Sequence, residues 1–142
     1  MENPRECALD VLIKVDKKEE LSHIAISNVL EKYQFSEKRD RAFFTRLVEG
    51  TLERQITIDY VADQFSKTKI RKCKPLIRAL LRMGIYQLLY MDQVPDSAAC
   101  NEAVKLAKKR GFSRLSGFVM EYSAIFQEKK KRSVIQRRTR IL

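Results

Sequence analysis

The sequence contains few of the residues from which metal, nucleotide and membrane sites are built. Its single histidine, His23, and its three widely spaced cysteines, Cys7, Cys73 and Cys100, form no Cys-x-x-Cys or Cys/His pair, which argues against a zinc site. No two of the four glycines have the Gly-x-Gly spacing that cradles a nucleotide or a methyl-donor cofactor. We therefore expect free thiols in a reducing cytosol, with no metal and no cofactor.

The chain also lacks a signal peptide and a long hydrophobic run. Its most apolar stretch, residues 76–91, is interrupted by Arg78 and Arg82 and is too short to span a bilayer. This stretch predicts a core helix, and the protein as a whole is expected to be cytoplasmic.

Glycine and proline are scarce, and β-branched residues do not alternate as they do in strands, so the sequence favours an all-α domain. With 142 residues, 44% of them hydrophobic, the chain can form one packed domain. Apolar residues at helical spacing predict helices near 4–15, 22–33, 38–52, 75–91, 96–110 and 113–119, with a loop at 66–74. Residues 56–65 form either a shorter helix of their own or a continuation of the helix at 38–52.

Single residues near helix ends and inside one helix give more local predictions. Asn3 is expected to cap the first helix, and Asp96 or Ser97 the sixth, which Gly111 should end. A further glycine, Gly50, lies inside the third helix, where glycine costs about 1 kcal/mol relative to alanine. A close contact between two helices would compensate for that cost.

The net charge of +11 indicates an anionic partner, most commonly nucleic acid. From residue 127 to residue 142 there are seven basic residues and one acidic residue, which give +6 and leave +5 for the rest of the chain. About half of the basic excess therefore lies in the C-terminal tail.

The other cations gather in a few short segments, where they can converge on RNA phosphates. Lys74, Arg78 and Arg82 recur every four residues, so they lie on one stripe of a helix. The alternative is that these cations lie on solvated faces and in intramolecular ion pairs. The predicted RNA-binding residues are Arg5, Arg39, Arg41, Lys72, Lys74, Arg78, Arg82, Lys105, Lys108, Lys109 and Arg110.

The sequence gives little support for catalysis. His23 has no candidate nucleophile near it in the sequence. Lys72 and Lys74 would lower the pKa of Cys73 if that thiol were exposed, but no general base accompanies it. We predict that this chain is not an enzyme by itself.

Several separated blocks of sequence together resemble one family. The blocks are Arg39-Asp40-Arg41-Ala42-Phe43, Leu47-Val48-Glu49-Gly50-Thr51-Leu52, the run 81–90, and Val94-Pro95 followed by 101–108. They resemble the NusB-like N-terminal domain of the bacterial small-subunit ribosomal RNA cytosine-C5 methyltransferases of the Sun/Fmu type, over about residues 5–119. NusB, the antitermination factor, shares the fold and the Asn-Glu-Ala-Val block that begins at Asn101.

This resemblance implies an all-α, NusB-like helical bundle that binds ribosomal RNA and helps to position a catalytic domain. Arg5 aligns with the basic N-terminal region that such domains use on RNA, whereas Arg41 and Arg82 fit either an RNA contact or a structural role. One alternative is a NusB-like transcription antitermination factor, which would bind RNA together with a ribosomal protein. Another is a helical protein-interaction module without RNA affinity. The sequence leaves a monomer and a homodimer both open.

The resemblance ends at Val119. Family members continue Gly-Phe-Val with Asn-Gly-Val-Leu-Arg and a long S-adenosylmethionine-dependent domain, whereas here Met120-Glu121-Tyr122 follows. The codons of residues 120–127, read one base out of step, allow Asn-Gly-Val-Leu-Arg-Asn-Ile-Ser. We therefore predict an RNA-binding domain at 1–119 and a basic tail at 120–142, which is either a frameshift product or a segment selected for RNA. The family's catalytic cysteines belong to the other domain, so none is assigned to this chain.

Overall fold

The computed structural model describes residue 1 and residues 3–141, with the side chains of all of them except 116 and 133–141. Within these residues the chain forms seven α-helices, one short 3-10 helix and no strand. The elements are α1 (Pro4–Asp16), α2 (Ser22–Lys32), α3 (Lys38–Glu53), α4 (Gln55–Phe65), η1 (Ile70–Lys72), α5 (Pro75–Tyr90), α6 (Asp96–Lys109) and α7 (Ser116–Ile141). The predicted all-α class is confirmed.

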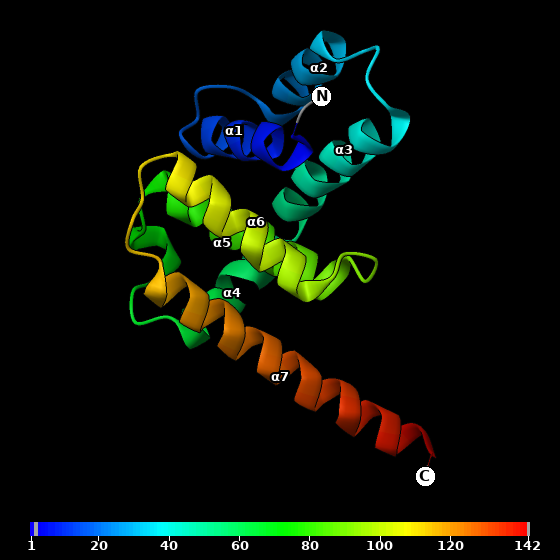
Figure 1. The fold of residues 1–142 in the computed structure, drawn as a ribbon, viewed down its shortest axis with the longest axis vertical. Helices are drawn as coiled ribbons and strands as arrows, with labels where there is room; N and C mark the ends of the chain where they lie inside the picture. The colour runs from blue at the N-terminus through cyan, green and yellow to red at the C-terminus, as the bar shows by residue number, and fades with distance from the viewer. Residues whose placement is uncertain (2, 142) are drawn as a thin grey trace.

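Helix α5 is the centre of the bundle. It packs against α1, α3, α4, α6 and α7, and all ten residues from Ala79 to Leu88 are buried (Figure 1). The prediction of a core helix at 76–91 is therefore confirmed. In the part of the chain that the structure describes, no helix has both the length and the apolar character needed to cross a membrane.

The ends of α1 and α6 confirm two of the predicted caps. At the start of α1, the Asn3 side chain accepts a hydrogen bond from the backbone N–H of Glu6 at 3.1 Å. At the end of α6, Gly111 has a φ of +90°, which L-residues with a side chain rarely adopt. The N–H groups of Gly111 and Phe112 then donate to the carbonyls of Lys108 and Ala107, at 3.1 and 2.9 Å.

Three other predictions need correction. Neither Asp96 nor Ser97 caps α6, because Pro95 occupies the cap position and the Asp96 carboxylate lies 3.5 Å from the Lys129 ammonium. Helix α7 begins at Ser116 rather than at residue 113. The loop at 66–74 contains η1, which forms because Ile70 is buried there and donates its N–H to Asp63 at 2.8 Å.

At Gly50, helix α3 lies directly against a side chain of α5. A Cβ atom built on Gly50 would lie 2.1 Å from both Cζ and Oη of Tyr86, far inside van der Waals contact. The close helix–helix contact predicted at this glycine is confirmed.

Helix α7 runs through residue 119 without a break, and its first half completes the core. Tyr122 and Ile125 are 4% and 3% exposed, and the Tyr122 hydroxyl donates to the Asp96 carbonyl at 2.9 Å. The division at residue 119 stays a prediction, but the packing has a practical consequence. A shortened chain that ends at Val119 would lose core side chains, so the effect of the basic tail on RNA binding is better tested by ending the chain after Arg132.

Replacing Tyr122 with phenylalanine should lower the free energy of unfolding by about 1 kcal/mol at neutral pH, because one buried hydrogen bond is lost. Burial, with the neighbouring Cys100 and Asp96, raises the pKa of the Tyr122 phenol above its usual value near 10. Above pH 10 the unfolded chain therefore releases this proton while the folded chain keeps it, so the wild type should lose about 1.4 kcal/mol per pH unit from this group.

Tyr122→Phe lacks that group, so the two stability curves should converge between pH 10 and 11. Urea unfolding at pH 7, 10 and 11 measures the difference directly. Curves that stay parallel to pH 11 would show that Tyr122 ionises normally in the folded protein.

Candidate nucleic-acid interface

Two of the arginines that the sequence predicts as RNA-binding residues point into the protein. Arg78 and Arg82, on α5, form a buried ion-pair network with Asp16 of α1 and Asp59 of α4. The Asp16 carboxylate lies 2.6 Å from Arg78 and 3.2 Å from Arg82, and Asp59 lies 2.8 Å from Arg82. The arginine side chains are 15% and 10% exposed, so most of each guanidinium is withdrawn from solvent.

The contacts of these two arginines show a structural role. Burial alone lowers the pKa of Arg82, but hydrogen bonds and charge from Asp59 and Asp16 outweigh it and raise that pKa. Arg78 also donates to the backbone carbonyls of Arg71 and Cys73 at 2.9 Å, which fastens the α4–α5 connection to the core. We therefore leave both arginines out of the proposed RNA surface.

Arg41 is likewise engaged within the protein, since its guanidinium donates to the Leu30 carbonyl at 3.3 Å. Of the two roles that the sequence allowed for Arg41 and Arg82, the observed contacts favour the structural one.

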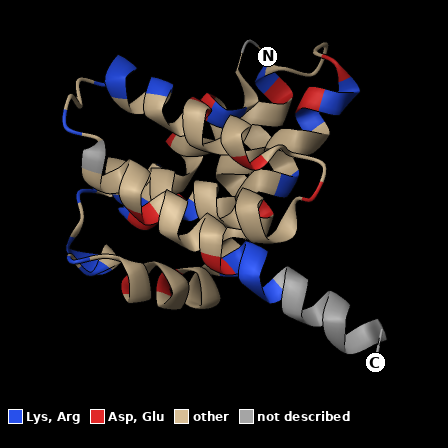
Figure 2. Ribbon diagram, turned by 60° about the horizontal axis from the view of Figure 1, so that its bottom comes forward, with Lys and Arg blue, Asp and Glu red and all other residues tan. Residues whose placement is uncertain are grey.

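The cations that face solvent concentrate at one end of the bundle, which we call the basic end. It consists of the α4–α5 connection and the segment that closes α6, which lie along the left edge of Figure 2. The segments 66–74 and 108–114 contain nine basic residues and no acidic one: Lys67, Lys69, Arg71, Lys72, Lys74, Lys108, Lys109, Arg110 and Arg114. All nine are exposed. The Lys74 ammonium lies 5.5 Å from the centre of the Phe112 ring, so the two segments are adjacent.

Two of these nine cations are tied to α1. Lys109 lies 2.8 Å from Glu6, and Arg110 lies 2.8 Å from Asp10. The other seven have no ion-pair partner among the described residues. On the exposed side of α6, Lys105 lies 3.6 Å from Glu102, a surface pair that is worth little and that a phosphate can displace. The basic end thus presents cations that are free to bind an anion.

A second cationic region is a groove of about 640 Å³ between the start of α1, α3 and the α5–α6 turn. Arg5, Arg39 and Arg46 line it, together with Phe43 and one acidic residue, Asp40. Arg5 donates to the buried Gln87 at 2.8 Å and stacks over the Phe43 ring at 5.0 Å. Burial lowers the pKa of Arg5 from its usual value. The sequence predicted Arg5 and Arg39 here, but not Arg46, which donates to the Tyr90 carbonyl at 3.0 Å.

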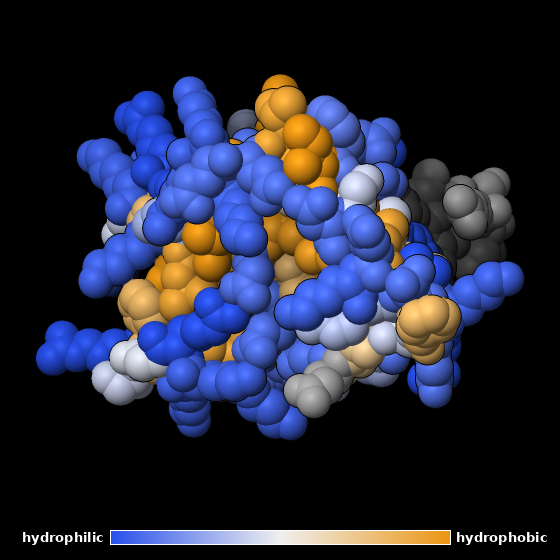
Figure 3. Space-filling view, turned by 90° about the horizontal axis from the view of Figure 1, so that it is seen from above, coloured by the Kyte–Doolittle hydropathy of each residue, from blue (hydrophilic) through white to orange (hydrophobic). Residues whose placement is uncertain are grey.

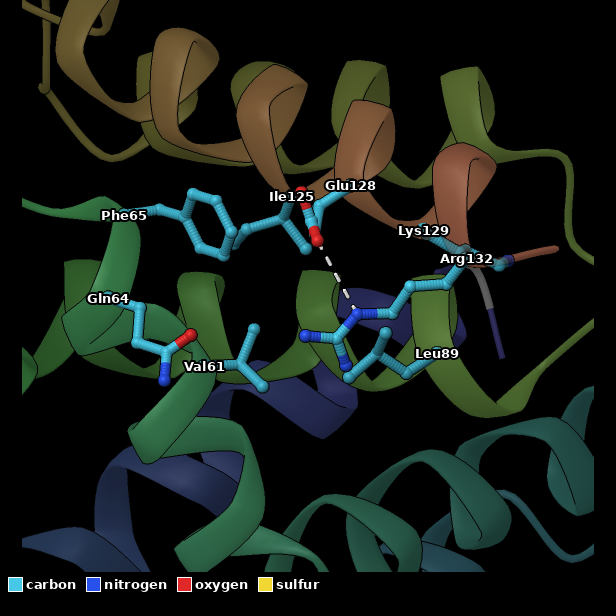
Figure 4. A pocket seen from close by; sticks show the side chains of 8 residues that line it. All are labelled: Val61, Gln64, Phe65, Leu89, Ile125, Glu128, Lys129 and Arg132. Atoms are coloured by element: carbon cyan, nitrogen blue, oxygen red, sulfur yellow. Dashed lines mark ion pairs between the residues drawn. The ribbon is translucent and has the colours of Figure 1, made fainter. Parts of the chain in front are cut away.

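Another cavity lies between α4, α5 and α7, with a volume of about 200 Å³ (Figure 4). Its walls are the apolar side chains of Val61, Phe65, Leu89 and Ile125. The ion pair between Arg132 and Glu128, at 3.5 Å, crosses its edge. Since its one carboxylate already has a cationic partner, the cavity offers no free general base or nucleophile for chemistry.

The structure adds no catalytic or metal centre within the residues it describes. No group of three or more His, Cys, Asp or Glu side chains there is close enough to hold a metal. His23 is exposed, and the three cysteines are free and half-buried. Burial raises the pKa of all three thiols, and at Cys73 the charge of Glu121 raises it further. The lowered pKa considered for Cys73 is therefore not what the folded protein has.

The face seen in Figure 3, on the α2 side of the molecule, shows apolar side chains among hydrophilic ones. The large apolar side chains exposed on α2 and its flanks are Leu21, Ile24 and Phe35. Exposed apolar side chains of this kind are what a protein-interaction module would use, and α4 also exposes two, Ile56 and Tyr60.

The chain is similar to known proteins both in its sequence and in its fold. The sequence model of the NusB family matches residues 2–119. The chain is 37% identical over 115 residues to the "Probable ribosomal RNA small subunit methyltransferase B" of Bacillus subtilis (strain 168) and 39% identical over 119 residues to its namesake from Synechocystis sp. (strain PCC 6803). These alignments cover 81% and 84% of this chain but 25% and 26% of the relatives, so the chain spans about a quarter of their length.

Shorter relatives match over most of their own length. The chain is 34% identical over 116 residues to the transcription antitermination protein NusB of Bacillus velezensis, covering 81% of this chain and 85% of that protein. A crystal structure of the antitermination factors NusB and NusE in complex with dsRNA superposes with a TM-score of 0.77 at 22% identity, over 88% of this chain and 94% of that one. T. maritima NusB gives 0.75 at 20% identity, over 88% and 89%. The predicted NusB-like helical bundle is confirmed.

Proposed function

The chain belongs to the NusB family, and from that premise we propose that it is an RNA-binding domain that directs a ribosomal RNA methyltransferase to its substrate. The observation that carries the proposal is the basic end, where seven exposed cations on two adjacent segments have no ion-pair partner among the described residues. Exposed cations that lie close together and are not paired with acids are what phosphate contacts require.

Sequence similarity supports a role in a ribosomal RNA methyltransferase. Two methyltransferase relatives are 37% and 39% identical to this chain, against 34% for the NusB of Bacillus velezensis. We propose that the parent enzyme is of the cytosine-C5 type and that methyl transfer takes place in a separate domain. In this arrangement the present domain supplies affinity and orientation, with ribosomal RNA as its partner in the cytoplasm.

The second candidate function is transcription antitermination. It is favoured by length, because the chain covers 85% of the Bacillus velezensis NusB but only about a quarter of the methyltransferases. The two functions differ in their need for a protein partner. We expect this domain to bind ribosomal RNA fragments unaided, whereas an antitermination factor should gain affinity when a NusE-type protein is added.

Replacing Lys72, Lys74 and Lys108 with glutamine should weaken RNA binding about equally for all sequences. If each lysine contacts one phosphate, the slope of log affinity against log salt should fall in magnitude by about 2 to 3. Mobility shifts of small-subunit ribosomal RNA fragments between 50 and 200 mM salt measure both effects. A matched control is Lys18→Gln/Lys32→Gln/Lys38→Gln, which removes three exposed lysines that lie outside both the basic end and the C-terminal tail.

If both triple variants lose affinity equally, net charge alone drives binding and the basic end is not a site. If the wild type binds no RNA at low salt, the proposed function is wrong.

A further inference from the structure

We propose that a pocket at the basic end binds one unpaired base of the RNA, with Phe112 as the surface on which that base stacks. This inference rests on the proposed function and deepens it, because it names the form of RNA that the site selects. It assigns a role to an aromatic residue and a cavity that cations alone do not explain.

The pocket has a volume of about 290 Å³ and lies between the α4–α5 connection, the first half of α5 and the segment that joins α6 to α7. Apolar side chains form its inner wall: Ile77, Leu81, Leu115 and Phe118. This volume is just below the usual range for drug-sized ligands, so it suits a single flat ring system. The base of one unpaired nucleotide is such a group.

Phe112 is held in place by the turn that closes α6. The positive φ of Gly111 and the bond from the Phe112 N–H to the Ala107 carbonyl at 2.9 Å direct the chain back toward α5. The Phe112 ring is half-buried and lines the pocket. In the free protein the Lys74 ammonium lies 5.5 Å from its centre. An exposed lysine can move aside, so a base can take its place over the ring.

The charges around the pocket fix which end of a nucleotide enters. Glu121 lines the pocket, and its carboxylate lies 2.7 Å from the Ser66 hydroxyl. A carboxylate repels a phosphate but can accept a hydrogen bond from the edge of a base. Lys74 and Arg114 also line it, and both are exposed. The base therefore points inward, and its phosphate pairs with the cations at the mouth.

Stacking of one base on an aromatic side chain is lost when that side chain is truncated, so Phe112→Ala should weaken binding of unpaired RNA about tenfold. The probes are a hairpin RNA with an unpaired loop and a duplex of matching length and composition, bound to the full chain. Duplex affinity should change less than twofold, because a duplex offers no free base. Phe112→Tyr keeps the ring and should bind like the wild type. The matched control is Phe35→Ala, which removes an aromatic side chain that is 95% exposed on the α2–α3 connection.

A second measurement does not depend on a Phe112 variant that folds. Cys73 lines the same pocket, whereas Cys7 and Cys100 do not. In the wild type, the hairpin RNA should slow alkylation of Cys73, relative to the two other thiols, several-fold more than the duplex does, because only an unpaired base enters the pocket that Cys73 lines.

The possible results test the base pocket and the proposed function separately. If the wild type binds the hairpin but Phe112→Ala binds it equally well, or if the hairpin and the duplex protect Cys73 to the same extent, the base pocket is wrong and the phosphate surface stands. If the wild type binds neither RNA, the proposed function fails, and this inference fails with it.

Discussion

Replacing Gly50 with alanine is expected to destabilise the fold by about 3 kcal/mol, in the range that overpacking a rigid core costs. The new Cβ would lie 2.1 Å from two atoms of the Tyr86 side chain. Tyr86 is 6% exposed and stacks on Tyr90 with ring centres 5.4 Å apart, so it has little room to move away. The helix α3 would have to shift from α5, and a helix pair at the centre of the bundle would separate.

The control for this substitution lies in the same chain. A Cβ on Gly117, near the start of α7, meets no atom within 4 Å, so Gly117→Ala should be neutral or stabilise by up to about 1 kcal/mol through helix propensity. Urea unfolding measures both variants. In a Tyr86→Ala background the cost of Gly50→Ala should disappear, because the clash is gone. A cost that persists there would mean that something other than Tyr86 makes glycine necessary.

Asp16→Ala should cost a similar amount, about 3 to 4 kcal/mol. One carboxylate serves two arginines here, at 2.6 Å from Arg78 and 3.2 Å from Arg82, and the arginine side chains are 15% and 10% exposed. Removing one member of a largely buried ion pair leaves a charge that water solvates poorly, which costs more than the pair itself contributes. In this variant Arg82 still pairs with Asp59, so most of the lost stability comes from the unpaired charge of Arg78.

The same unfolding experiment has a surface control in Glu128→Gln. That carboxylate is 40% exposed and pairs with an arginine that is 73% exposed, so its removal should change stability by less than about 0.5 kcal/mol. Because Arg78 also holds the carbonyls of Arg71 and Cys73, Asp16→Ala should weaken RNA binding at temperatures where the variant is still folded. Equal stability of the two variants would contradict the view that this network holds α1, α4 and α5 together.

The helices themselves could be predicted from the sequence, because apolar residues that recur with a period of 3.6 mark the buried face of a helix. The sequence also showed that Lys74, Arg78 and Arg82 share one face of a helix. It did not show whether that face points to solvent or into the protein. Arg78 meets Asp16 across 62 residues of sequence, a separation that periodicity within one helix cannot indicate. Whether such a stripe faces solvent or buried carboxylates depends on which helix packs over it.

The candidate site shows the same limit. The cations of the basic end could be listed from the sequence, whereas their convergence depends on two connections that meet only in the folded chain. Phe112 was not predicted as a site residue, because one aromatic residue after a helix-ending glycine carries no periodic signal. The cap predicted at Asp96 or Ser97 was wrong, because Pro95 occupies the cap position and the Asp96 carboxylate pairs with Lys129.

The interior acids of the bundle have a consequence for how a ligand arrives. Asp16 and Asp59 neutralise arginines inside the protein, so the positive potential of the helical bundle, the C-terminal tail apart, is expected to be strongest at the two segments with nine cations and no acid. Such a lopsided field exerts a torque on the molecule as it diffuses near a polyanion, and turns that end forward before any contact forms. Salt should therefore slow the encounter itself, in addition to shortening the lifetime of the complex.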